Sequence, residues 1–221
     1  MIGQDEPAVA HTIFGSRLPQ ARRYAELLAD LGVQRGLIGP RETDRLWERH
    51  LLNSAVIGEL IGPAATVLDV GSGAGLPGIP LGIARPDLAM TLLEPMARRV
   101  TFLIEVVDQL ELVNVSVVRG RAEDTAVRRL VAGGEFVTAR AVAPLERLVG
   151  WCLPLLGPAG QLLAVKGSAA QREVDAARSA LRAAGAVAVE VVSVGLGLLS
   201  TPTTVVRVIA PAAGRLRRRT R

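Results

Sequence analysis

Val67-Leu68-Asp69-Val70 runs directly into Gly71-Ser72-Gly73-Ala74-Gly75, and this stretch decides the fold. The first four residues have the apolar character of a short buried strand, and a helix is expected from about Leu76 to Ala84. Glycines allow a turn with unusual backbone angles and let a ligand approach the main chain. The helix that follows directs its N–H groups and the positive end of its dipole at that ligand. The stretch therefore predicts a ligand-binding loop at the carboxyl end of a strand.

Beyond residue 62, short β-branched runs alternate with amphipathic stretches, which indicates βαβ units and a mostly parallel sheet. The last two runs are separated only by the turn-rich segment 195–202, so we expect them to pair antiparallel. This layout is that of a Rossmann-like class I methyltransferase: an α/β fold with a seven-stranded, mostly parallel sheet and an antiparallel C-terminal hairpin. The expected strands are 66–70, 89–94, 115–119, 135–139, 161–165, 187–194 and 203–209, and the later helices are 97–110, 124–131, one starting at Pro144, and 171–184.

The register of the glycines bears on the choice of cofactor. Residues 73–78 formally match the dinucleotide pattern G-x-G-x-x-G. However, counted from Gly71, where the strand enters the loop, the sixth position is Leu76, which is too large for the close packing asked of the third glycine. Glu94, at the end of the second strand, suits ribose hydroxyls in either cofactor. These residues favour S-adenosylmethionine and leave a dinucleotide open.

Two further strand ends contribute candidates to the same edge of the sheet. After the third strand, Ala122 and Glu123 could face the adenine amino group, while Asp124 could cap the next helix. After the fourth strand, Arg140 is expected at the lip of the pocket. An arginine in that place could also be a simple ion-pair partner.

Missing motifs narrow the transfer chemistry. The fourth strand is not followed by the Asn/Asp-Pro-Pro-aromatic loop common in methylation of exocyclic amines. Cys152 falls inside a predicted helix and is expected to be a buried hydrophobe, not the nucleophile of pyrimidine carbon-5 methylation. Guanine N7 has a free lone pair and no proton, so its methylation would need alignment and water exclusion but no general base.

The composition is that of an ordinary folded protein with no membrane segment. No apolar run reaches the length of a membrane helix, the acidic N-terminus is unlike a signal peptide, and one cysteine gives neither a disulfide nor zinc-binding spacing. We expect a cytoplasmic protein without a metal.

The excess charge of the chain lies in its last seven residues. The net charge is +5, and this tail holds five arginines and no acid, so the rest is neutral. Such an arm suits phosphate binding with counterion release, or it could be a solvated terminus. The arginines expected to contact RNA are Arg215, Arg217, Arg218, Arg219 and Arg221.

Taken together, the residues resemble the bacterial 16S rRNA guanine-N7 methyltransferase G family, also called glucose-inhibited division protein B. The resemblance covers about residues 20–210 and is carried by segments 47–54, 67–80 and 138–143, and by the sole lysine, Lys166. It implies N7 methylation of one guanine in the decoding-region hairpin of small-subunit rRNA, with 16S rRNA or the small ribosomal subunit as partner. It also implies cofactor contacts at Gly71, Leu76, Glu94, Ala122, Glu123 and Arg140, to which the loop itself adds Ser72, Gly73 and Gly75.

The positions expected to engage rRNA or to act in catalysis are His50, Asn53, Arg140 and Lys166, although packing or a salt bridge would also explain them.

We expect a monomer with a helical extension (1–62), an S-adenosylmethionine-dependent methyltransferase domain (63–210) and a basic tail (211–221). Within the extension, Thr43 or Asp44 is expected to cap a second helix. A small-molecule methyltransferase, a catalytically inactive RNA-binding protein and a dinucleotide oxidoreductase remain alternatives.

Overall fold

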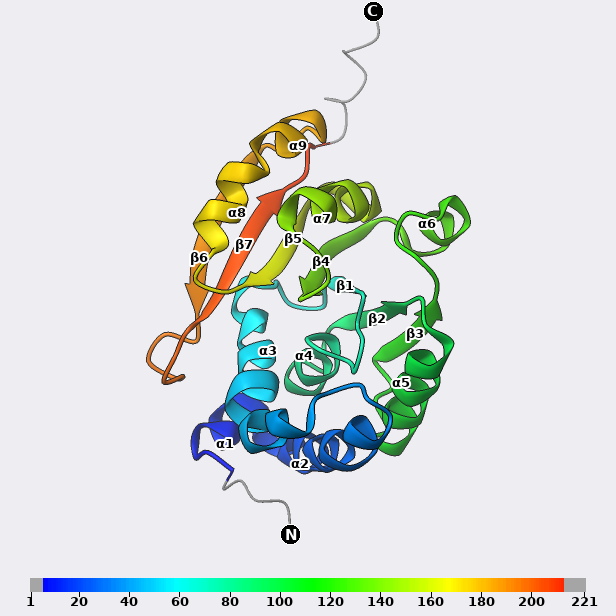
Figure 1. The fold of residues 1–221 in the computed structure, drawn as a ribbon, viewed down its shortest axis with the longest axis vertical. Coiled ribbons are helices and arrows are strands. Elements are labelled where there is room, and N and C mark those ends of the chain that lie inside the picture. Colours follow the sequence, from blue (N-terminus) through cyan, green and yellow to red (C-terminus); the bar gives the residue numbers. More distant parts are fainter. Residues whose placement is uncertain (1–5, 213–221) are drawn as a thin grey trace, which may run out of the picture.

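The computed structural model describes residues 6–212, which form one seven-stranded sheet with helices on both faces (Figure 1). The strand order is β3-β2-β1-β4-β5-β7-β6, in which β1 to β5 run parallel and β7 is antiparallel to both β5 and β6. This confirms the predicted fold class. The strands are β1 (Thr66–Val70), β2 (Ala89–Glu94), β3 (Val115–Arg119), β4 (Gly134–Arg140), β5 (Leu156–Lys166), β6 (Ala188–Val194) and β7 (Thr203–Ile209).

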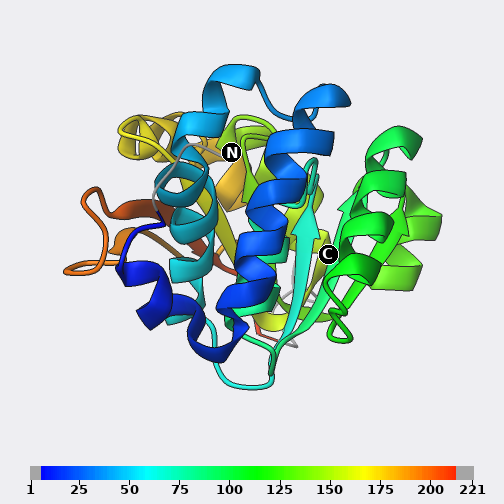
Figure 2. The same ribbon diagram turned by 90° about the horizontal axis from the view of Figure 1, so that it is seen from below.

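Each face of the sheet has its own buried apolar cluster. One cluster joins the sheet to the N-terminal helices, α4 and α5, and the other joins it to α6 through α9. In Figure 2 the blue and cyan N-terminal helices and the green α5 lie in one layer in front of the strands. The helices of the two layers are α1 (Val9–Phe14), α2 (Leu18–Leu27), α3 (Asn53–Ala55), α4 (Gly78–Ala84), α5 (Ala97–Gln109), α6 (Thr125–Val131), α7 (Leu145–Cys152), α8 (Ala170–Ala176) and α9 (Arg178–Ala183).

The second N-terminal helix differs from its predicted form. Pro40–Arg45 is a 3₁₀ turn, Leu46–Leu52 has π-helical geometry, and α3 and a 3₁₀ turn at Val56–Leu60 complete the segment. The hydroxyl of Thr43 donates to the Pro40 carbonyl at 2.7 Å and so stabilises the 3₁₀ turn. The prediction of an N-cap at Thr43 or Asp44 is therefore wrong.

Two other helical predictions need adjustment. The single helix expected over 171–184 is divided into α8 and α9 at Ala177. Asp124 does occupy the N-cap position of α6, but its side chain makes no capping hydrogen bond. Cys152 is fully buried at the end of α7, and burial raises the pKa of its thiol to about 12, as suits a packing residue.

The topology places the functional edge of the sheet. The strand order reverses between β1 and β4, and ligands of open parallel sheets bind at the carboxyl ends of the strands where this happens.

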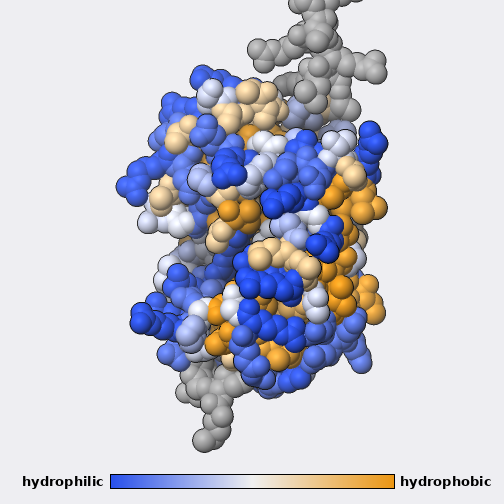
Figure 3. Space-filling view, turned by 45° about the vertical axis from the view of Figure 1, so that its right-hand side comes forward, coloured by the Kyte–Doolittle hydropathy of each residue, from blue (hydrophilic) through white to orange (hydrophobic). Residues whose placement is uncertain are grey.

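At the other side of the molecule, hydrophobic surface gathers over α5, the edge strand β3 and α6 (Figure 3). Ile104 of α5 and Leu130 of α6 are among the exposed apolar side chains there.

Candidate active site

The glycine loop at the end of β1 is shaped by close packing at two of its glycines. Gly71 and Gly75 both have positive φ, and a Cβ there would lie 2.8 Å from Val142 and 2.5 Å from Ile79, respectively. Gly73 has a φ of +60° but open surroundings, because a Cβ at this position would have no neighbouring atom closer than 3.8 Å. Neighbouring side chains therefore exclude a Cβ at positions 71 and 75, whereas the space beside Gly73 is open.

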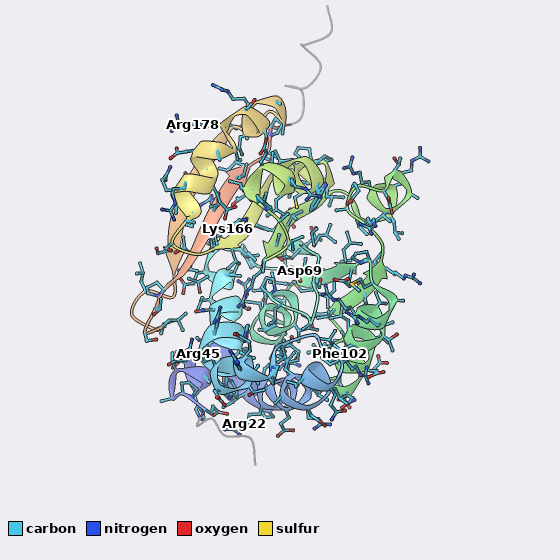
Figure 4. All side chains as sticks on the ribbon, viewed as in Figure 1. Arg22, Arg45, Asp69, Phe102, Lys166 and Arg178 are labelled. Atoms are coloured by element: carbon cyan, nitrogen blue, oxygen red, sulfur yellow. The ribbon has the colours of Figure 1, made fainter. Side chains whose placement is uncertain are left out.

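Asp69 of β1 links the strand before the loop to β4 and α4 through hydrogen bonds. It is fully buried at the centre of the molecule (Figure 4) and accepts hydrogen bonds from the Thr138 hydroxyl at 2.8 Å and the Gly78 N–H at 3.2 Å. Burial raises the pKa of this carboxyl to about 6, although these hydrogen bonds oppose the shift. The side chain thus joins β1, β4 and the start of α4. An acid inside the apolar run 67–70 was the available signal, but our sequence analysis gave it no role.

Glu94 braces the loop from the adjacent strand. One oxygen accepts from the Gly73 N–H at 3.0 Å and the other from the Met96 N–H at 2.9 Å, and the side chain is almost fully buried. Arg99 lies 3.7 Å from the same carboxylate. The predicted acid is therefore in place at the end of β2, where it holds the loop open at Gly73.

A cavity of about 360 Å³ lies over the loop. Among the predicted cofactor residues, Gly71, Ser72, Gly73, Leu76 and Arg140 line it, whereas Gly75, Glu94, Ala122 and Glu123 do not. The Ala122 carbonyl accepts from Arg128, and Glu123 is exposed, 3.9 Å from Arg121.

The opposite wall of this cavity was missed in the sequence analysis. It consists of Leu37, Ile38 and Glu42, which come from the segment between the N-terminal helices, together with Arg99 of α5. The apolar pair Leu37-Ile38 between two glycines was the only local signal, and it does not reveal where the segment packs.

Arg140 is held against the N-terminal helices by a set of hydrogen bonds. Its guanidinium donates to the Arg49 carbonyl at 2.8 Å, the Ser54 hydroxyl at 3.1 Å and Nδ1 of His50 at 3.0 Å. Nε2 of His50 lies 2.8 Å from the Glu42 carboxylate. Because a guanidinium can only donate, Nδ1 must be the acceptor, so Nε2 carries the proton and donates it to Glu42. Burial and Arg140 lower the pKa of His50, although Glu42 opposes them.

A second cavity, of about 900 Å³, adjoins the first over the ends of β4 and β5. Arg49, Arg140 and Ala141 line both cavities, so Arg140 lies between them. Asn53 and Lys166 line the second cavity, and His50 lines the first. The structure therefore brings the four predicted residues to one place.

Lys166 and Asn53 both have partners in this second cavity. The Lys166 amine donates to the Glu173 carboxylate at 2.7 Å and to the Ala143 carbonyl at 2.9 Å (its place is labelled in Figure 4). The main-chain carbonyl of Asn53 accepts from the Thr203 hydroxyl at 3.1 Å, and its side-chain amide lies 3.5 Å from the Arg49 carbonyl oxygen. The predicted RNA-contacting arginines at 215–221 lie outside the described residues.

Within residues 6–212, no helix has the length and apolar character needed to cross a membrane, and no His, Cys, Asp and Glu side chains form a metal-binding group of three or more.

Solved structures with this fold include the following two proteins. A SAM-dependent methyltransferase from Aquifex aeolicus gives a TM-score of 0.52 at 19% identity and covers 86% of this chain and 97% of its own. Fibrillarin from Aeropyrum pernix, in complex with natively bound S-adenosyl-L-methionine, gives 0.51 at 19% identity and covers 72% and 74%. At these identities the likeness concerns the fold.

Sequence relatives are much closer. The chain is 54% identical over 211 residues to the ribosomal RNA small subunit methyltransferase G of Mycobacterium sp. (strain JLS), covering 95% of this chain and 93% of that protein. It is 56% identical over 203 residues to the protein of the same name from Rhodococcus jostii, covering 92% and 89%. The family profile of rRNA small subunit methyltransferase G matches residues 17–200. These matches, over a chain that has the glycine loop and the two adjoining cavities described above, show that the chain belongs to the rRNA small subunit methyltransferase G family.

Proposed function

We propose that this protein transfers a methyl group from S-adenosylmethionine to N7 of one guanine in the decoding-region hairpin of 16S rRNA. The family membership and the names of the relatives support a small-subunit rRNA substrate. The choice of N7 as the acceptor atom depends on whether any side chain around the two cavities is free to act as a general base.

The residues over the glycine loop fit the cofactor. The space at Gly73 admits a ligand close to the main chain, Leu37, Ile38 and Leu76 supply apolar surface, and Glu94 supplies a carboxylate beside the loop. Glu94 is buried behind the loop on the Gly73 and Met96 N–H groups, so it would position the loop on the ribose side of the cofactor. Glu123 and the Ala122 backbone, which lie outside the cavity, stay candidates for the adenine edge. When bound, S-adenosylmethionine supplies an electrophilic methyl group on a sulfonium.

The observation that carries the proposal is that each candidate base of the two cavities is already engaged by a cation or a proton donor. Nδ1 of His50 accepts from Arg140, Glu42 accepts from His50, and Glu173 accepts from Lys166. The hydrogen bond from His50 lowers the pKa of Glu42. Burial opposes the ionisation of Glu173, but Lys166 and the Leu145 N–H outweigh it and lower that pKa as well.

Groups held in this way are poor proton acceptors, so the described site favours an acceptor atom that loses no proton. Guanine N7 is such an atom, whereas exocyclic amines and hydroxyls are not. The work left to the protein is to align the base and exclude water.

Arg140 is placed to contact the substrate or the cofactor during this alignment. Its guanidinium lies between the two cavities and cannot contact N7, because the N7 lone pair must stay free for the transfer. We therefore assign Arg140 to guanine O6, to a phosphate or to the methionine carboxylate of the cofactor. A soluble, monomeric enzyme acting in the cytoplasm fits this substrate.

The test is to incubate the protein with methyl-labelled S-adenosylmethionine and, separately, with 16S rRNA, 30S subunits and total small metabolites. Nucleoside mass spectrometry of the digested RNA should find 7-methylguanosine as the labelled product. Label on another guanine atom would refute N7, and label in a metabolite and not in RNA would refute the rRNA substrate. An Arg140→Lys variant should methylate at least about tenfold more slowly, because one ammonium cannot replace the forked guanidinium contacts. Reduced cofactor affinity in this variant would place Arg140 on the methionine carboxylate, and unchanged affinity would place it on the RNA.

A further inference from the structure

A third cavity continues from the two that contain the site. It has a volume of about 710 Å³ and lies between the N-terminal helices and the β6–β7 loop. Arg49, Asn53 and Thr201 line both this cavity and the one beside Arg140. The three cavities thus adjoin one another. We call the outer one the flanking groove, and the residues that matter here are Arg45, Glu48, Arg49, Leu198, Ser200 and Thr201.

The walls of the flanking groove are held in place from inside the protein. The Gly195 N–H, at the start of the β6–β7 loop, donates to the Glu59 carboxylate at 3.0 Å, and the Leu199 N–H closes the loop on the Gly195 carbonyl at 2.9 Å. At its end, the Thr203 hydroxyl donates to the Asn53 carbonyl. The loop and the helical segment 46–60 are therefore fastened at both ends of the groove, so the groove is formed before any ligand arrives.

The side chains presented in the groove are those that suit a nucleic acid strand. Arg45 and Arg49 are exposed, Ser200 and Thr201 add hydroxyls, and Leu198 is 40% exposed at the loop. Guanidinium groups and hydroxyls are common phosphate and sugar ligands, and an exposed apolar side chain can lie against the face of an unstacked base. The exposed Glu48 is the acidic member of the set.

We propose that the flanking groove binds the nucleotides next to the target guanine, with Arg45 and Arg49 on their phosphates and Leu198 against a base. This inference rests on the proposed rRNA substrate. A guanine that enters the second cavity as part of a polymer must have its neighbours leave along a connected surface. The shared residues Arg49, Asn53 and Thr201 give that path.

The test measures binding of a 16S rRNA transcript over a series of salt concentrations, together with methylation kinetics. R45Q and R49Q should each weaken binding about three- to tenfold and flatten the slope of log K against log salt by about 0.7. E48Q should strengthen binding, because it removes an acid from the phosphate path. L198A should weaken binding without changing the slope. In methylation, R45Q and L198A should raise the KM for RNA and leave kcat unchanged. R49Q is judged by binding and salt slope alone, because Arg49 also lines the two cavities of the site.

Arg182 gives the matched control. It is also exposed, but it lies on α9, at the opposite end of the molecule from α1 and α2 (Figure 1), so R182Q should leave affinity and slope unchanged. Cofactor affinity, measured by titration calorimetry, should be the same in R45Q, E48Q, L198A and R182Q and verifies that they fold. The fold of R49Q is verified by denaturant unfolding, because Arg49 also lines the cavity over the glycine loop.

The outcomes separate this inference from the proposed function. If the unaltered protein neither binds nor methylates 16S rRNA or 30S subunits, both fail. If it methylates rRNA but R45Q, R49Q and E48Q keep its affinity and salt slope, the groove assignment alone is overturned. Effects confined to 30S subunits, with transcript binding unchanged, would assign the groove to a ribosomal protein and would also overturn it.

Discussion

Arg140 connects the two halves of the site through a single side chain. It comes from the end of β4, yet its hydrogen-bond acceptors lie on the N-terminal segment, at Arg49, His50 and Ser54. Burial lowers the pKa of the guanidinium, but an arginine side chain remains charged at neutral pH. The desolvated charge needs these acceptors, so the position of Arg140 depends on the N-terminal helices being packed in place.

The protonation of His50 is a direct prediction of this arrangement. Nitrogen-15 NMR of the imidazole should show the Nε2–H tautomer and a pKa below 6.5, since burial and Arg140 disfavour the cation. Glu42→Gln should lower that pKa further, because Glu42 is the group that favours the charged ring. The chain has two histidines, and His11 is largely exposed, so a His11→Asn variant assigns the signals.

The same shift predicts the sign of a stability change. Because the unfolded chain takes up the proton first, the contribution of His50 to the free energy of unfolding is complete above about pH 6.5 and declines as the pH falls below it. A His50 that titrates at or above 6.5, or that carries its proton on Nδ1, would contradict the described hydrogen bonds.

At the scale of elements, the glycine loop and the start of α4 contain glycines with two different roles. Gly78, at the start of α4, is pressed against the sheet, and a Cβ there would lie 2.3 Å from Leu92 and 2.8 Å from Asp69. Gly73 has open space in the same direction. Gly78 thus serves packing, whereas Gly73 is proposed to admit the cofactor, although the two are five positions apart in the same motif.

A pair of alanine variants separates the two roles. Gly78→Ala should reduce the free energy of unfolding by about 1–3 kcal/mol, because Leu92 and Asp69 are buried and cannot retreat easily. Gly73→Ala should cost about 1–2 kcal/mol for the positive φ and reduce cofactor affinity at least tenfold. Denaturant unfolding and calorimetric titration with S-adenosylhomocysteine measure the two effects. Unchanged affinity in Gly73→Ala would place the cofactor elsewhere.

The strands were predictable because their signals are local. Four strands have the predicted bounds, since each is a short run rich in apolar and β-branched residues between turn signals: Thr66–Val70, Ala89–Glu94, Val115–Arg119 and Thr203–Ile209. The irregular helix at 40–60 was not predictable in its details. Its 3₁₀ and π-helical turns satisfy tertiary contacts such as those of His50 and Ser54 with Arg140, and no local propensity encodes them.

The site was predictable only in part, for a similar reason. Motif residues at strand ends, such as Glu94 and Arg140, can be placed from topology alone. The wall formed by Leu37, Ile38 and Glu42 depends on how the N-terminal segment packs over the loop, which involves contacts of long sequence separation. Asp69 could have been recognised as a buried acid, but its partners Thr138 and Gly78 are apparent only in the folded chain.

At the scale of the whole molecule, the glycine loop and the candidate RNA surface lie on one edge of the sheet. The N-terminal helices contribute to both, because the segment 37–50 lines the proposed cofactor cavity and the segment 45–53 lines the flanking groove. The positive tail is a further candidate for RNA contact, proposed from its charge alone, and it lies outside the described residues.

Removing the tail charge is the test at this scale. Replacing the five arginines at 215–221 with glutamine should weaken binding to 16S rRNA and flatten its salt dependence by about 0.7 for each phosphate that the tail no longer neutralises. Affinity for the cofactor should not change. A deletion of residues 215–221 serves as the parallel variant, and an unchanged salt slope in both would show that the tail has no part in RNA binding.

The sole lysine of this sequence has a wider consequence. Lys166 is 8% exposed and bonded to Glu173, so every other cationic side chain that can face RNA at neutral pH is an arginine. A guanidinium neither loses its proton near neutral pH nor accepts the acetyl groups that neutralise lysines. Acetylation therefore leaves the cationic surface of the protein intact, and amine-directed dyes or crosslinkers should react mainly at the α-amino group.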